Sequence, residues 1–369
     1  WTAMENRREA VAVLIEAGAD IEAVDPSSGY SALLLAAELG RTEITALLRE
    51  AGADAEGRDE ETGKTLLMNA SAEGNHDKVS TLIAAGADMD NRDDNGLAAI
   101  HHAAITDNSE IISLLLQSGD DPNKPAAGSR ATPLMLSAER GHSAATRVLL
   151  TSGADVSAED RYGSTAIHYA AYSGSVEIIE LLSEAGAAVR AKVGSTGATP
   201  LMLAAGHNSP EVVSFILRSD PGQIDEIDHN DYRAIHYAAI SGEAETIGLL
   251  LDSGADIEAR DAWSYIDSFF AETPLVKSVR ANNTAGVEYL IQRGADAHAA
   301  ARGSRYPVIL LAAESGDPEI IRALVRGGAN IHERSHDTDV TPLIMAVQSN
   351  TRKAVEELID LGADVDGRD

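Results

Sequence analysis

The sequence predicts an all-α solenoid, in which about eleven helix-turn-helix units with hairpin loops between them stack along the 369 residues. Two observations predict this fold. The phrase Gly-Ala-Asp, or a variant such as Gly119-Asp-Asp or Gly186-Ala-Ala, recurs from Gly18 onward, with glycine spacings of 34, 34, 33, 34 and 33 residues as far as Gly186. A fixed period of this length is typical of one small unit repeated many times. The composition is the second observation, because 44% hydrophobic but only 4% aromatic residues suit a core of alanine and leucine.

Each unit is expected to contain two helices. The first begins at a Thr-Pro pair such as Thr132-Pro133, where threonine can act as the N-cap and proline lacks an N–H that would be unpaired anyway. In the unit around Ala166 this helix ends at Gly174. Gly186 is expected to end the second helix in the left-handed conformation. Between these glycines, the side chains expected to face the core are Ile178, Ile179, Leu181 and Leu182.

These phrases resemble the ankyrin repeat, whose pattern T-P-L-H-x-A-A is followed by a glycine and a Leu-Leu pair. Residues 166–174 read Ala-Ile-His-Tyr-Ala-Ala-Tyr-Ser-Gly and are similar to the first half of that pattern. The resemblance covers essentially the whole chain. Residues 1–369 are therefore expected to form a single ankyrin repeat array, with a partial repeat at 1–24 and ten further units. The register at both ends predicts that the array is a segment of a longer protein.

Charge and composition limit the kinds of partner. The net charge is −30, so a nucleic acid backbone would be repelled, whereas a protein partner with a basic surface would be attracted. The alternative is that this charge serves only to keep a long array soluble. No run approaches the roughly 20 apolar residues needed to cross a bilayer, so direct membrane insertion is not expected. The absence of cysteine rules out disulfides, thiolate zinc sites and a cysteine nucleophile. The resemblance implies a cytoplasmic protein that can be a subunit of a larger assembly.

The sequence does not predict catalysis, a cofactor or a metal site. Residues 332–336 read His-Glu-Arg-Ser-His, which satisfies the zinc motif H-E-x-x-H. That motif requires both histidines on one helix face, whereas His332 and His336 follow Gly328 in an expected loop between units. A zinc hydrolase centred on His332 is therefore disfavoured. The resemblance gives His101, His168 and His236 a structural role, in which the imidazole bonds to the backbone of a neighbouring loop.

The resemblance also implies where partners bind. In this family the loop tips and the exposed face of the first helices line a concave groove that binds other proteins. Tyrosine and arginine are the residue types most often found at binding hot spots. The alternative for each residue is simple packing between neighbouring loops. In this register the candidate partner-binding residues are Tyr30, Lys64, Tyr162, Tyr172, Tyr232 and Arg280.

One insertion breaks the period. Gly254 and Gly294 are 40 residues apart, which places about six extra residues in the loop 261–272. Acidic residues at Asp261, Asp267 and Glu272 accompany its aromatic residues and are expected to contact basic groups. An exposed aromatic cluster is costly unless something covers it, so we expect a partner anchor here. The alternative is a loop that folds onto its own groove. The aromatic anchor residues are Trp263, Tyr265, Phe269 and Phe270.

Taken together, these features predict a non-catalytic scaffold that binds partner proteins through the concave groove, the loop tips and the insertion 261–272. The alternative is a regulatory or substrate-recruiting array of a larger enzyme, effector or channel whose active domain lies outside this chain.

Overall fold

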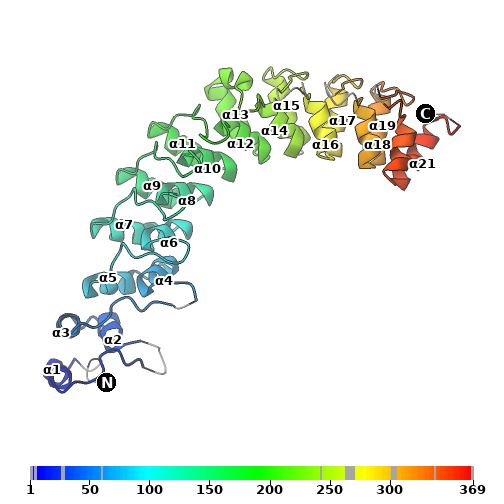
Figure 1. Ribbon diagram of the computed structural model, residues 1–369. Coiled ribbons are helices and arrows are strands. Elements are labelled where there is room, and N and C mark those ends of the chain that lie inside the picture. The colour runs from blue at the N-terminus through cyan, green and yellow to red at the C-terminus, as the bar shows by residue number, and fades with distance from the viewer. Residues whose placement is uncertain are drawn as a thin grey trace. The chain divides into compact units, whose positions relative to one another are not determined.

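The computed structural model describes residues 3, 6–25, 30–59, 61–241, 243–261, 271–300, 306–335 and 338–366 (Figure 1). These residues form 21 α-helices and one short 3₁₀ helix, and the described part of the chain contains isolated bridges but no strands. The predicted all-α fold is therefore confirmed. The chain divides into two compact units, Trp1–Tyr169 with Glu180–Ala187, and Ala170–Ile179 with Ala188–Asp369.

The helices alternate between the first and second helix of successive repeats from α2 onward. The first unit holds α1 (Arg8–Glu16), α2 (Ala32–Glu38), α3 (Thr42–Glu50), α4 (Leu66–Glu73), α5 (His76–Ala85), α6 (Ala99–Ile105), α7 (Ser109–Gln117), α8 (Pro133–Glu139) and α9 (Ser143–Thr151). Residues of both units occur in α10 (Ala166–Ser173) and α11 (Val176–Glu184). The second unit holds α12 (Pro200–Gly206), α13 (Pro210–Ser219), η1 (Pro221–Asp225), α14 (Ala234–Ser241), α15 (Ala244–Asp252), α16 (Pro274–Arg280), α17 (Thr284–Gln292), α18 (Val308–Ser315), α19 (Pro318–Arg326), α20 (Pro342–Gln348) and α21 (Arg352–Asp360).

The first helices start as the Thr-Pro pairs predict. The Oγ1 atom of Thr132 accepts a hydrogen bond from the Met135 backbone N–H at 3.3 Å, and Pro133 is the first helical residue. This side chain pairs one of the N–H groups that a helix start leaves without a partner. Gly174 and Gly186 adopt positive φ angles of 75° and 94°, as expected for the residues that end the two helices.

The Gly-Ala-Asp turn has a structural reason to recur. The Asp54 carboxylate accepts a hydrogen bond from the Glu56 N–H at 2.9 Å, which closes a tight turn just after the second helix. The Glu56 carboxylate then accepts the N–H of Asp88, in the next repeat, at 2.8 Å. This turn is therefore closed by its own aspartate and hydrogen-bonded to the turn of the next repeat.

Within each unit the repeats pack in two rows. In the first unit α4, α6 and α8 are neighbours, while α3, α5, α7 and α9 form the second row. In the second unit the first row is α12, α14, α16, α18 and α20, and the second row is α13, α15, α17, α19 and α21. Small residues such as Ala204 and Ala238 are fully buried and allow the first helices to lie close together. Among the described helices, none is long and apolar enough to cross a membrane.

Candidate functional site

The candidate site is a row of side chains at equivalent positions on the first helices of the second unit. Each lies seven residues after the residue that precedes its helix, and across α10, α12, α14 and α16 the row reads Tyr172, Gly206, Ile240 and Arg280. Tyr172 and Ile240 are 50% and 43% exposed, which is high for large apolar groups. Three of the four positions therefore present a large side chain, and Gly206 presents none.

A surface pocket of about 280 Å³ lies where that side chain is missing. A Cβ atom at Gly206 would lie 3.2 Å from the Tyr237 ring, so glycine leaves this space open. The wall is mostly apolar and aromatic. The pocket is lined by Leu203, Gly206, His207, Asp228, Asn230, Tyr232, Tyr237, Ile240 and Ser241.

Aromatic contacts fix the walls of this pocket. The ring of Tyr172 lies against His207, with ring centroids 3.8 Å apart. Burial lowers the pKa of His207 from its ordinary value, so its imidazole is neutral at pH 7. On the other side, Tyr232 and Tyr237 meet edge to face, with centroids 6.1 Å apart.

A buried aspartate holds the loop tip that carries Tyr232. The Asp228 Oδ1 atom accepts the backbone N–H groups of Asn230 and Tyr232, both at 2.8 Å. The other oxygen, Oδ2, accepts the Tyr237 hydroxyl at 2.7 Å. Burial, together with this hydrogen bond, raises the pKa of Tyr237, so its hydroxyl keeps the proton that it donates. The same arrangement occurs in the first unit, where Tyr169 donates to Asp160 at 2.7 Å.

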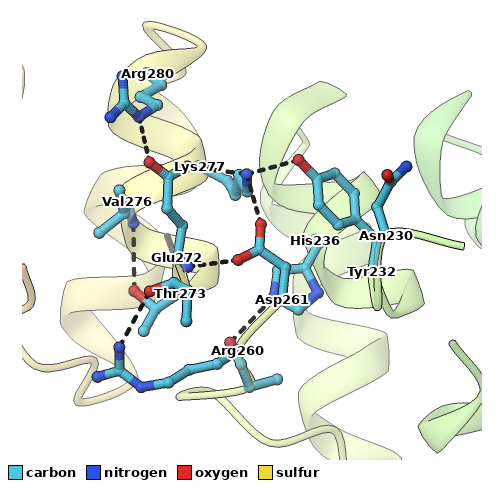
Figure 2. Close-up of polar contacts among 12 residues, drawn as sticks. Asn230, Tyr232, His236, Arg260, Asp261, Glu272, Thr273, Val276, Lys277 and Arg280 are labelled. Atoms are coloured by element: carbon cyan, nitrogen blue, oxygen red, sulfur yellow. Dashed lines mark hydrogen bonds and ion pairs between the residues drawn. The ribbon is translucent and has the colours of Figure 1, made fainter. Parts of the chain in front are cut away.

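A buried lysine fixes the far side of Tyr232 (Figure 2). The Lys277 Nζ atom donates to the Tyr232 hydroxyl at 2.6 Å and lies 4.5 Å from the centre of its ring. Nζ also pairs with Asp261 Oδ2 at 2.8 Å and with Glu272 Oε2 at 2.9 Å. Burial by itself would lower the pKa of Lys277, but the bonds to Asp261, Tyr232 and Glu272 outweigh burial and raise it.

The insertion is anchored by the same cluster. The Asp261 N–H donates to the Glu272 carbonyl at 3.3 Å, whereas equivalent loops close over fewer residues, as from Asp228 to Tyr232. Asp261 and Glu272 are both buried and bind Lys277, and Arg280 Nε donates to Glu272 Oε1 at 2.6 Å. The acidic residues at the two ends of the insertion therefore pair with basic groups of this chain. Asp267 and the predicted anchor residues Trp263, Tyr265, Phe269 and Phe270 lie outside the described residues.

The remaining candidate residues lie in the first unit. Tyr30 is half-buried and its hydroxyl accepts a hydrogen bond from Lys78 Nζ at 2.6 Å. Lys64 is half-buried at a loop tip, where its carbonyl accepts the N–H of Asp59 at 2.9 Å. Tyr162 is 53% exposed, and the guanidinium of Arg161 lies 4.7 Å from its ring centre. Of the six groove candidates, the structure thus brings Tyr172, Tyr232 and Arg280 together around the pocket and its lysine cluster.

The histidines behave as the resemblance implied. His101 Nδ1 accepts the Ala98 N–H at 3.0 Å, and its Nε2–H donates to the carbonyl of Lys124, in the next loop, at 2.9 Å. His236 makes the same pair of contacts with Arg233 and Ala259, at 3.0 and 3.1 Å. Both imidazoles are fully buried and bond on both nitrogens.

The H-E-x-x-H segment lies in a loop, as predicted. Residues 331–335 are not helical and fall between α19 and α20, while His336 lies outside the described residues. Among the residues that the structure describes, no group of three or more His, Cys, Asp or Glu side chains is arranged to hold a metal ion.

Sequence reasoning missed the residues that make the pocket. His207, Tyr237 and Ile240 were not candidates, although Ile240 occupies the same register position as Tyr172 and Arg280. Counting seven residues from each N-cap would have found Ile240. It would also have shown that Gly206 leaves a gap between two large side chains.

Comparison with known proteins agrees with this architecture. The family profile described as "Ankyrin repeats (3 copies)" matches residues 33–126, 100–193, 190–261 and 275–369. The chain is 27% identical to Rabankyrin-5 of Mus musculus over 211 residues, which cover 54% of this chain and 18% of that protein. It is 27% identical to ankyrin repeat domain-containing protein SAT10 of Stachybotrys chartarum over 227 residues, covering 61% and 11%. It is 31% identical to inversin of Canis lupus familiaris over 164 residues, covering 44% and 15%. The chain thus spans less than a fifth of each relative's length.

Proposed function

Because the chain belongs to the ankyrin repeat family, we propose that it is a non-catalytic scaffold that binds partner proteins, with its main contact at the pocket around Gly206. The observation that carries this proposal is the pocket wall of Tyr232, Tyr237 and Ile240, with the exposed ring of Tyr172 lying against His207 beside it. Large apolar groups grouped on one surface mark interaction sites more often than isolated ones do.

The size of the pocket favours a protein partner over a small molecule. At about 280 Å³ it lies just below the usual range for small-molecule sites, roughly 300–1,000 Å³. A cavity of this size suits one large side chain from a partner. Protein interfaces typically concentrate their binding energy in such anchor side chains, which insert into well-packed pockets.

The aromatic insertion is the second part of the proposed surface. Its described ends, Asp261 and Glu272, both pair with Lys277, which also binds the pocket wall at Tyr232. The insertion therefore begins and ends next to the pocket. We expect the double change Trp263→Ala with Phe270→Ala to weaken partner binding roughly 100-fold with little change in melting temperature. A much lower melting temperature with normal binding would instead make the insertion a structural element.

The proposal is tested by blocking the pocket. Peptides that bind the full chain are selected from a phage-displayed random library, and their dissociation constants are measured by fluorescence anisotropy. Gly206→Leu should weaken binding at least tenfold, because the new side chain occupies the space that a partner side chain would fill. Gly206 has no positive φ angle, so the backbone tolerates a leucine, but its Cβ would lie 3.2 Å from the Tyr237 ring, which must shift slightly. Circular dichroism therefore checks that the variant stays folded.

A matched control comes from the same unit. Tyr289 on α17 is half-buried like Tyr232 but lies in the second row of helices, so Tyr289→Ala should leave binding unchanged. The proposal fails if no peptide is enriched on the full chain. It also fails if the enriched peptides bind the Gly206→Leu and Tyr172→Ala variants as tightly as the original protein.

A second candidate function is favoured by the comparisons. The matched segments make up only 18%, 11% and 15% of the three relatives, so in each relative the segment similar to this chain is a small part of a much longer protein. The alternative is therefore a regulatory or substrate-recruiting array of a larger enzyme, effector or channel. It would use the same pocket, and it predicts that the natural ligand is a substrate or another segment of that larger protein.

The net charge of −30 leads us to propose a partner whose surface is basic overall, and the family leads us to propose a cytoplasmic location.

A further inference from the structure

Beside the pocket, one basic side chain faces solvent in this strongly acidic chain. Arg280 lies at the same register position as Ile240, one first helix further along, and its side chain is 45% exposed. Its Nε atom donates to Glu272 (Figure 2), but its two terminal nitrogens make no hydrogen bond to the described residues. Those nitrogens still have donors to offer, and a guanidinium fork suits a carboxylate.

The charge of Arg280 is only partly offset by its neighbours. Glu272 carries one negative charge, but it also pairs with Lys277, which in turn pairs with Asp261. The charges of these four side chains therefore sum to zero, and the exposed member of the group is the positively charged Arg280. The surface next to the pocket thus accepts a negative group, although the chain as a whole is acidic.

The pocket rim also carries polar groups with unused hydrogen-bonding capacity. The Asn230 side-chain amide and the neutral His207 imidazole line the pocket and make no side-chain hydrogen bond to the described residues. An amide offers both donors and an acceptor, which suits the backbone of an extended peptide. The pocket would take a side chain of such a segment, and the rim would bond to its main chain.

Resting on the function proposed above, we propose that the partner segment is an extended stretch with a large apolar anchor for the Gly206 pocket and a carboxylate side chain for Arg280, about four residues away. The pocket lies between α12 and α14, and Arg280 lies on α16. Packed helices are about 8–10 Å apart, so the separation is roughly one and a half helix spacings. An extended chain rises about 3.3 Å per residue and covers that distance in about four residues.

The inference is tested with the peptides selected on the full chain. Enriched sequences should carry Phe, Tyr, Trp, Leu, Ile or Met about four residues from Asp or Glu. One such peptide is then synthesised with its acidic residue as Glu and as Gln, and both are titrated against the original protein and Arg280→Gln. The substitution should weaken the Glu peptide about tenfold and the Gln peptide less than twofold, and added salt should reduce the difference.

The controls separate this inference from the proposed function. Arg280→Lys keeps the positive charge but lacks the planar guanidinium, so it should give an intermediate loss of affinity for the Glu peptide. Circular dichroism checks that each variant stays folded. Equal effects of Arg280→Gln on the two peptides would overturn the inference. Enriched peptides that fill the pocket but show no acidic preference would overturn it too, although the scaffold proposal would stand. Only a failure to enrich any pocket-dependent peptide would overturn both.

Discussion

Two buried lysines, one in each unit, show how the same chemistry serves different purposes. Lys124 in the first unit is 5% exposed, and its Nζ pairs with Asp90 and Asp120 and donates to the Met89 carbonyl at 2.9 Å. It joins the turns of neighbouring repeats. Lys277 in the second unit is 9% exposed and binds Asp261, Glu272 and Tyr232. It joins both ends of the insertion to the wall of the candidate site.

The two clusters differ most in how exposed their carboxylates are. The side chains of Asp261 and Glu272 are 1% and 8% exposed, so without Lys277 the buried Asp261 would have no cation beside it and the buried Glu272 would keep only Arg280. Around Lys124 only Asp120 is buried, because the Asp90 side chain is 81% exposed and water can hydrate it. The free energy of unfolding that is lost with a buried cation therefore depends on how many buried carboxylates remain beside it.

The largest expected effect is on the second unit. Lys277→Met should lower the free energy of unfolding by about 3–5 kcal/mol, because it leaves two buried carboxylates with one basic neighbour, Arg280. Urea denaturation followed by circular dichroism measures the loss. Adding Asp261→Asn and Glu272→Gln should recover most of it by removing the stranded charges. A loss below about 1 kcal/mol for Lys277→Met alone would contradict the proposed role of this cluster.

Acid should destabilise both units through their buried histidines. Burial lowers the pKa of His101 to about 4, and burial also lowers the pKa of His236. In the unfolded chain both regain a pKa near 6.5, so the unfolded state binds more protons below that pH. The stability from His101 is present above pH 6.5, and on the order of 3 kcal/mol is lost as the pH falls toward 4.

Urea denaturation between pH 7 and pH 4.5 measures this loss. A His101→Gln variant should lose less stability over that range than the original protein, because it has one histidine fewer to protonate. The side chain of His76 is 54% exposed, so His76→Gln serves as the control and should follow the original curve. Identical curves for all three proteins would rule out the proposed contribution of His101.

The corresponding change in the first unit should have a smaller effect on stability. Lys124→Met should cost about 2 kcal/mol, because Asp120 is the one carboxylate left buried without a cation and it keeps the hydrogen bond from the Asp121 N–H. The measurement is the same urea titration, run beside Lys277→Met. If Lys124→Met destabilised the chain as much as Lys277→Met, carboxylate exposure would not be what separates the two clusters.

The smallest predicted effect concerns a hydrogen bond that both units contain, so its contribution to stability should be the same in each. Tyr169→Phe and Tyr237→Phe each remove one hydroxyl from a buried aspartate, Asp160 in the first unit and Asp228 in the second. Each should cost about 1.5 kcal/mol, the low end of the range for a hydrogen bond to a charged group. Thermal or urea unfolding of the pair tests this. A difference above about 1 kcal/mol would mean that the two loop tips are not equivalent.

Much of the fold follows from the sequence because its signals are local. The Thr132-Pro133 start and the left-handed Gly186 are decided by a few neighbouring residues, and the repeat multiplies each signal. The family pattern similarly assigned His101 and His236 to structural contacts. The loop position of His332 followed from counting residues after Gly328.

The site depends on contacts between residues far apart in the chain, and only the tertiary structure decided them. Tyr232 is 45 residues from Lys277, and Tyr172 meets His207 from a neighbouring helix. No local preference encodes these pairs, because each depends on how side chains of successive repeats are brought together by packing. The sequence by itself determined the repeat and the register, so it could place Tyr172, Tyr232 and Arg280 on one face. The packed helices decided that Gly206 opens a pocket there and that Asp261 and Glu272 turn inward to Lys277.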